Sequence, residues 1–148
     1  MPGLMRKLLF ISFVGALTMA LLPAAAPAGT SSTSSTWTSQ ANQVCSVWLV
    51  KAKTLFATPV KPSGLYKFAG DAKKLESQEL AQLATIPNRS AAGTHALNVM
   101  NSDIAEVGSA ISAYDRGDSA SFIRILKLYL NDHRAKVAFA AAGAQQCG

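Results

Sequence analysis

Residues that carry out chemistry are scarce in this chain of 148 residues. It contains eight acidic residues, two histidines and two cysteines. The Gly-x-Ser-x-Gly elbow of serine hydrolases does not occur, and neither does a His-Glu-x-x-His or Glu-x-x-His metal pair. A glycine-rich phosphate loop is also missing. We therefore predict that the protein is not an enzyme and holds no metal and no cofactor.

Long apolar runs and alternating patterns are missing as well. The apolar run Leu8–Leu22 has 15 residues, whereas a bilayer-spanning helix needs about 20. No segment alternates polar and apolar side chains over a useful length, as a half-buried strand would. The sequence thus predicts an all-α protein with no transmembrane segment in the mature chain.

The N-terminus has the three parts of a secretory signal peptide. Arg6 and Lys7 precede the apolar run Leu8–Leu22, and small residues follow it. Ala26-Pro27-Ala28 offers small residues at both recognition positions, so we expect a signal peptide over residues 1–28. An uncleaved anchor is the alternative, and the shortness of the run disfavours it. We expect a secreted, extracytoplasmic protein.

The two cysteines allow a single pairing within the chain, Cys45 with Cys147. Thiols of exported proteins are oxidised, so we predict a disulfide. A metal-thiolate site or a redox pair would require the Cys-x-x-Cys spacing that the chain lacks. Closing a loop of roughly 100 residues stabilises a fold by at most ~4–5 kcal/mol.

Helical periodicity begins after a short polar segment. Residues 29–35 are rich in serine and threonine and predict a flexible leader, and residues 36–148 form the predicted domain. Apolar residues then recur at spacings of three and four, with Ser35 or Thr36 as the first cap. The four predicted helices run from Trp37 to about Thr58, from Leu65 to Ile86, from Ser90 to Tyr114, and from Asp118 to Ala144.

Short loops between these helices predict an antiparallel up-and-down four-helix bundle stapled by one disulfide. Gly117 suits the left-handed end of the third helix, and Asp118 suits the cap of the fourth. The two cysteines then lie at the same end of the bundle, with Cys45 some 13 Å along its helix. Either the first helix overhangs the bundle or the tail after Gly143 folds back.

Four stretches carry a resemblance: VCSVW in the first helix, LAQLATIP closing the second, YDRGDSASF, and the terminal AAAGAQQCG. With the signal peptide, they resemble the small secreted or lipid-anchored helical proteins of high-GC Gram-positive bacteria, which are mostly uncharacterised. The resemblance spans residues 37–147 and implies the fold alone. The lipobox cysteine found in many of those proteins is missing.

Basic charge is the main surface signal. Removing Arg6 and Lys7 with the signal peptide takes the formal charge from +6 to +4. Lysines gather on the first two helices and their loop, which predicts a binding surface for an acidic cell-envelope polymer or a membrane surface; a merely solubilising face is the alternative. No aromatic residues interleave with them, so nucleic acid is not an expected partner. The six are Lys51, Lys53, Lys61, Lys67, Lys73 and Lys74.

A second hypothesis is a carrier that holds an apolar ligand or haem between its helices. His133 is the one polar residue on the stripe of the fourth helix, which makes it a candidate ligand. The candidate pocket residues are Trp48, Met100, Tyr129 and His133. The pairs Glu76–Glu79 and Asp103–Glu106 are predicted to lie on solvated helix faces.

Two short motifs occur in the predicted loops and turns. Arg116-Gly117-Asp118 spells an integrin-binding tripeptide, but a helix end followed by a cap accounts for it. Asn88-Arg89-Ser90 is a glycosylation sequon in a predicted loop.

The leading hypothesis is a secreted, non-enzymatic interaction module of the cell envelope, whose specific partner is unknown.

Overall fold

The computed structural model describes residues 36–57 and 60–147. Within these residues the chain is helical and has no strand, which confirms the all-α class. The predicted signal peptide (1–28) and leader (29–35) lie outside the described residues. The elements are α1 (Trp37–Ala57), the 3-10 helix η1 (Pro62–Gly64), α2 (Leu65–Thr85), α3 (Ala91–Asp115), α4 (Ser119–Leu130) and α5 (Arg134–Ala141).

The helix boundaries follow the capping residues of the sequence. Thr36 Oγ1 accepts a hydrogen bond from the Ser39 amide, 3.3 Å away, at the start of α1. The side chain of Ser90 caps α3, and that of Asp118 caps α4. Gly117 has a φ of 81°, the left-handed conformation that glycine adopts without strain. The three caps and the glycine turn are therefore confirmed, and the Arg-Gly-Asp tripeptide lies in this turn.

The prediction of a single fourth helix from Asp118 to Ala144 is wrong. The helix α4 ends at Leu130, and a separate helix, α5, begins at Arg134. Asp132 Oδ1 accepts a hydrogen bond from the Arg134 amide at 2.8 Å, so a side chain just before the N-cap residue His133 binds the first amide of the new helix. The break rotates the buried face. Val137, on the predicted stripe, is 67% exposed, whereas Phe139 is 1% exposed.

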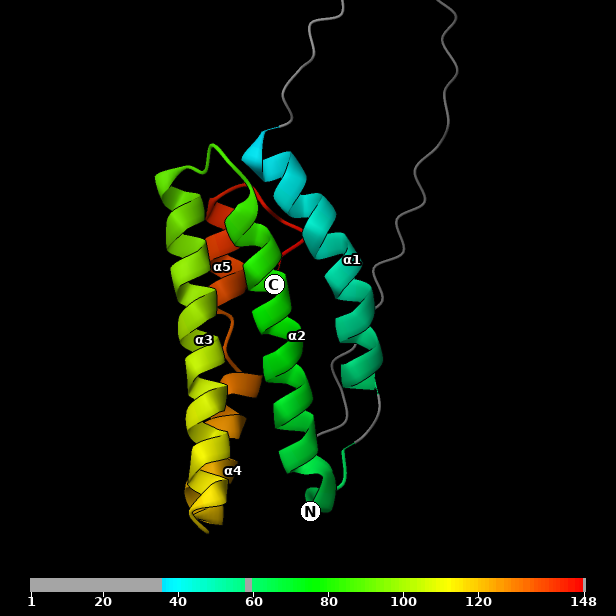
Figure 1. The fold of residues 1–148 in the computed structure, drawn as a ribbon, viewed down its shortest axis with the longest axis vertical. Helices are drawn as coiled ribbons and strands as arrows, with labels where there is room; N and C mark the ends of the chain where they lie inside the picture. The colour runs from blue at the N-terminus through cyan, green and yellow to red at the C-terminus, as the bar shows by residue number, and fades with distance from the viewer. Residues whose placement is uncertain (1–35, 58–59, 148) are drawn as a thin grey trace, which may run out of the picture. The chain divides into compact units, whose positions relative to one another are not determined.

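The helix α3 contacts most of the other elements (Figure 1). It packs against α2, and its other neighbours α4 and α5 lie along successive parts of its length. The helix α1 packs against α2. In the described part of the chain, no packing of comparable extent joins α1 to α4 or α5.

The buried side chains form two separate cores. The first core joins the N-terminal half of α1 to α2, α3, α5 and the C-terminal tail, with Trp37, Leu83, Leu97 and Phe139 among its members. The second core joins α2, α3 and α4 and includes Val107, Phe122 and Leu126, but no residue of α1. The C-terminal half of α1 therefore leaves one core without entering the other, and its Val50 is 65% exposed.

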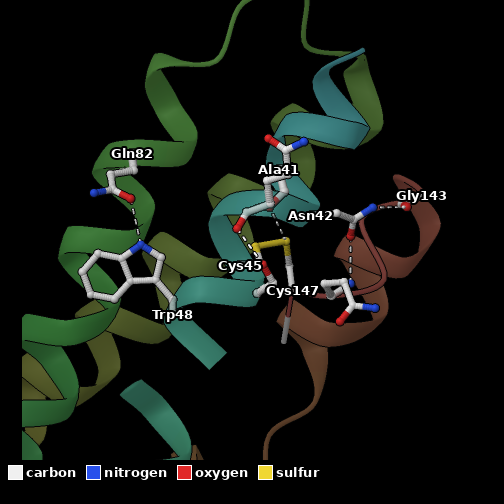
Figure 2. The surroundings of a disulfide bond; sticks show 10 residues. Ala41, Asn42, Cys45, Trp48, Gln82, Gly143 and Cys147 are labelled. Atoms are coloured by element: carbon white, nitrogen blue, oxygen red, sulfur yellow. Dashed lines mark hydrogen bonds between the residues drawn. A yellow bond between two sulfur atoms is a disulfide. The ribbon is translucent and has the colours of Figure 1, made fainter. Parts of the chain in front are cut away.

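The C-terminal tail is attached to α1 by the predicted disulfide, Cys45–Cys147, whose Cα atoms are 4.9 Å apart (Figure 2). Gly143, with a φ of 81°, turns the chain at the end of α5. Asn42 then bridges to the tail, because its Nδ2 donates to the Gly143 carbonyl at 3.4 Å and its Oδ1 accepts from the Gln146 amide at 2.9 Å.

Of the two alternatives for the cysteine register, the tail folding back is the one observed. The start of α1 does not overhang, because Trp37 is 3% exposed. Its ring lies against Gly93 of α3, where an added Cβ would come within 3.1 Å of the indole. Gly93 thus allows the first turn of α1 to approach α3 closely.

Candidate functional site

A cavity of about 180 Å³ lies where α1 leaves the first core. Helices α1, α2, α3 and α5 all contribute side chains to it. Cys45 of the disulfide and Gln146 of the C-terminal tail also line it. The C-terminal half of α1 packs on α2, where Phe56 contacts Phe68, but neither α4 nor α5 packs along it to a comparable extent, so space remains beneath this half. The larger apolar side chains that line it are Trp48, Leu49, Phe56, Leu75, Met100 and Phe139.

The indole of Trp48 is held in place from two sides. Its Nε1 donates a hydrogen bond to Gln82 Oε1 of α2 at 2.9 Å (Figure 2). The ammonium group of Lys51 lies 3.7 Å from the ring centroid, a cation–π contact. Trp48 is 3% exposed, so it forms a fixed wall of the cavity.

A second cavity, of about 350 Å³, adjoins the first. Both are lined by Phe56, Glu76 and Asp103. Tyr129 and His133 line the second cavity. The structure therefore divides the four predicted pocket residues, with Trp48 and Met100 in one cavity and the other two in its neighbour.

His133 lies near a helix end and not in the bundle interior, where a haem or metal ligand would have to lie. It precedes α5 in the break between the two helices, and its side chain is exposed at the second cavity. Its neighbour Asp132 bonds to Arg134. Met100, another of the candidate pocket residues and the one whose sulfur could also bind haem iron, lines the first cavity and not the second, so the two residues are not gathered into one site.

Glu76 lies at the junction of the two cavities. Its Oε1 accepts a short hydrogen bond from the Tyr129 hydroxyl, which links α2 to α4. Its Oε2 is shielded from solvent and has no hydrogen-bond partner. Burial raises the pKa of Glu76, and the Tyr129 hydrogen bond opposes that rise because it stabilises the carboxylate. Burial and the charge of Glu76 also raise the pKa of Tyr129, so the phenol stays a donor.

Glu79 lies one helical turn further along α2 and lines the first cavity. Within the described part of the chain, it makes no hydrogen bond or ion pair. Burial, followed by the negative charge of Glu76, raises the pKa of Glu79 from 4.5 to about 7. A carboxyl group at the cavity wall thus exchanges its proton near neutral pH.

The prediction that these carboxylates lie on solvated faces is wrong for Glu76, Glu79 and Asp103. Asp103 is 7% exposed, and both glutamates are half-buried. A signal was present in the sequence. Glu76 follows Ala72 by four residues, and Asp103 follows Met100 by three, so these acids fall on the apolar stripes themselves.

Arg134 binds three acidic side chains, of which Asp103 lines both cavities and Asp132 lines the second. Its Nη2 binds Asp103 Oδ1 at 2.9 Å and Glu106 Oε1 at 2.6 Å, and its Nε binds Asp132. Oxygen atoms of these three carboxylates lie within 4.8 Å of one another, a spacing that would suit a cation. The guanidinium supplies the positive charge for this group. It also fastens the start of α5 to α3, and we assign it a structural role.

The six predicted surface lysines are all exposed. Lys51, Lys61 and Lys67 line a shallow groove of about 530 Å³. The side chain of Lys73 instead lies over Gly108 of α3. Lys67 is paired with Asp71 at 2.6 Å. Apolar residues Leu55, Val60 and Phe68 line the same groove.

Comparison with known proteins identifies no relative of this chain. No protein-family model, no curated protein and no solved structure matches the chain. Among the residues that the structure describes, no helix is long and apolar enough to cross a membrane. The resemblance to secreted proteins of high-GC Gram-positive bacteria therefore stays a prediction.

Proposed function

We propose that this protein is a non-enzymatic carrier or receptor that holds a small apolar ligand beneath the C-terminal half of α1. The observation that carries the proposal is the cavity of about 180 Å³ between the two cores. Its wall is mainly apolar and aromatic with a few polar groups, which is the usual composition of a ligand site. Drug-sized ligands occupy pockets of roughly 300–1,000 Å³, so a smaller molecule is expected here.

The side chains around the cavity support binding rather than catalysis. Glu76, Glu79 and Asp103 are the ionisable groups among the described lining residues, and the lining includes no histidine, serine or lysine. A nucleophile with a neighbouring base is therefore not gathered there. The separation of Met100 from His133 favours a small apolar ligand over haem.

The cell compartment and the helix arrangement are part of the same proposal. Export through a signal peptide ending at Ala28 would bring the chain to the oxidising side of the membrane, and the Cys45–Cys147 disulfide agrees with that location. For the fold, we propose an up-and-down bundle that is open beside α1. The packing of α1 on α2, α2 on α3, and α3 on α4 supports this order.

Native mass spectrometry of the protein exported by its natural host tests the function directly. We expect a bound mass that is lost on denaturation, and a polypeptide that begins at Gly29. The Ala52→Leu variant should lose the bound mass, because Ala52 is half-buried and lines the cavity. Ala105→Leu is the matched control, since Ala105 is exposed on α3. Equal occupancy in the two variants, or an empty wild-type protein that also binds no added apolar compound, would overturn the proposal.

A second candidate function is binding of an acidic cell-envelope polymer, and the lysine groove is the observation that favours it. Three ammonium groups border one groove, and Asp71 is the one acidic residue among its described lining. Such binding would weaken with salt. Replacing Lys51, Lys61 and Lys67 by glutamate should abolish retention on an immobilised polyanion. Replacing Lys53, Lys73 and Lys74 in the same way should reduce it less, and equal losses would contradict a role for the groove.

A further inference from the structure

All the charged residues among the described lining of the cavity are acidic. Glu76 and Glu79 come from α2, and Asp103 comes from α3. Lysine, arginine and histidine are not among the described residues that line this cavity. A ligand in this space therefore meets mostly apolar side chains together with three carboxyl groups.

The carboxyl groups differ in how well they are already paired. Asp103 accepts a hydrogen bond from Arg134. Glu76 accepts one from Tyr129 at Oε1, while its Oε2 is fully buried and has no partner. Glu79, one turn away, makes no hydrogen bond or ion pair within the described part of the chain. A buried carboxyl oxygen without a partner is costly, and Glu76 Oε2 is such an atom. Glu79 is only half-buried, but its carboxyl group is also free to accept hydrogen bonds from a ligand.

We propose that the ligand of this cavity is a small organic amine with an apolar or aromatic body, whose ammonium group lies between Glu76 and Glu79. The inference rests on the proposed function and specifies the ligand class for the same site. An ammonium group has up to three donors and no acceptor, which matches oxygens that lack donors. A neutral alcohol of the same size has one donor and no charge, so it would pair less completely, and an anion would be repelled.

The remaining walls fit the body of such a ligand. Trp48, Phe56 and Met100 offer apolar surface, and two of them are aromatic. Aromatic faces attract cations, as the Lys51 ammonium group over the Trp48 ring already shows in this protein. The volume of about 180 Å³ limits the ligand to a compact body, such as one ring with a short alkyl amine.

The test compares three probes of nearly equal shape by isothermal titration calorimetry at pH 8: 2-phenylethylamine, 2-phenylethanol and 3-phenylpropanoate. A homologous series of straight-chain alkylamines covers other sizes. We expect an amine to bind about tenfold to a hundredfold more tightly than the matching alcohol, as expected for hydrogen bonds to a charged group. The carboxylate probe should not bind.

The matched variants are Glu79→Gln and Asp71→Asn. The first removes one of the two carboxylates proposed to flank the ammonium group and should lower the amine affinity toward that of the alcohol. The second removes one negative charge from the same helix outside the cavity and should leave the amine affinity unchanged. Thermal unfolding of each variant confirms that it is folded.

The outcomes separate this inference from the proposed function. Equal affinity for amine and alcohol, together with loss of both in Ala52→Leu, would overturn the amine assignment and keep the apolar carrier. Failure of all three probes and of the whole alkylamine series to bind the folded wild-type protein would overturn both. An unchanged amine affinity in Glu79→Gln would overturn the placement of the ammonium group.

Discussion

The Tyr129 hydroxyl donates a hydrogen bond to Glu76 Oε1 and so joins α4 to α2 across the junction of the two cavities. Tyr129 belongs to the second core, whereas Glu76 faces both cavities. This contact defines the border between the well-packed helices and the open space beneath α1. Its energetic importance can be measured.

The Tyr129→Phe substitution should lower the free energy of unfolding by about 1–3 kcal/mol at pH 8, because both oxygens of a buried carboxylate would then lack a partner. At pH 4.5 the loss should be smaller, since a protonated Glu76 has no charge to satisfy. Urea unfolding at the two pH values measures this difference.

Tyr66→Phe is the matched control for that measurement. Tyr66 also donates to a carboxylate, Asp115 Oδ1 at 2.9 Å, but on the surface. It should change stability little at either pH. A Tyr129→Phe effect as small as that of Tyr66→Phe would contradict the importance of the buried contact.

The stability of the protein should depend on pH through Glu79. Its pKa is about 7 in the folded chain and 4.5 without the fold. Between these values the folded state binds more protons than the unfolded state, so the unfolding free energy falls as pH rises, by about 1–3 kcal/mol. The raised pKa of Glu76 acts in the same direction.

Glu79→Gln should flatten this pH profile, because the amide does not titrate, and should be more stable than the wild type at pH 8. Unfolding curves at several pH values between 4 and 8 measure both effects. Asp71→Asn serves as the control and should keep the wild-type slope. A Glu79→Gln profile parallel to that of the wild type would show that Glu79 titrates normally.

The disulfide should stabilise the protein without being needed for helix formation. Replacing both Cys45 and Cys147 by serine should lower the unfolding free energy by about 2–5 kcal/mol, because the unfolded chain gains freedom when a loop with a sequence separation of 102 is opened. Circular dichroism should still show a helical protein. The double variant avoids a free thiol, and identical stability with and without reductant would contradict this prediction.

Arg134→Gln should destabilise the attachment of α5 to α3. Asp103, Glu106 and Asp132 would then lie close together without their shared positive charge. Since burial already raises the pKa of Asp103 and Arg134 opposes that rise, the loss of stability should be greater at pH 7 than at about pH 4. Hydrogen exchange of residues 134–141 measures the local effect.

Arg124→Gln is the comparison for that substitution, because Arg124 is exposed on α4 and forms no salt bridge in the described part of the chain. It should leave exchange in α5 unchanged. Faster exchange in both variants would indicate a general effect of charge rather than the specific contacts of Arg134.

Local sequence signals were sufficient for the first three helices and their ends. Ser90 and Asp118 have side chains that cap a helix wherever it begins, and Gly117 accepts a left-handed turn at no steric cost. The pairing of Cys45 with Cys147 also followed, because no other partner exists. The prediction of a single fourth helix was wrong because the Asp132 side chain binds the Arg134 amide. This local hydrogen bond interrupts the helix although the apolar period of the sequence continues.

The sequence by itself determined the helical class, the caps and the cross-link, since each depends on near neighbours or on a single possible partner. Tertiary structure alone decided which helices share a core. The C-terminal half of α1 has an apolar stripe like any other, yet neither α4 nor α5 packs along it. The cavity lies where that packing is missing, and only the three-dimensional packing brings Glu76, Glu79 and Asp103 to its wall. A cavity is formed by side chains that are distant in the sequence, whereas the apolar period of a sequence describes one helix at a time.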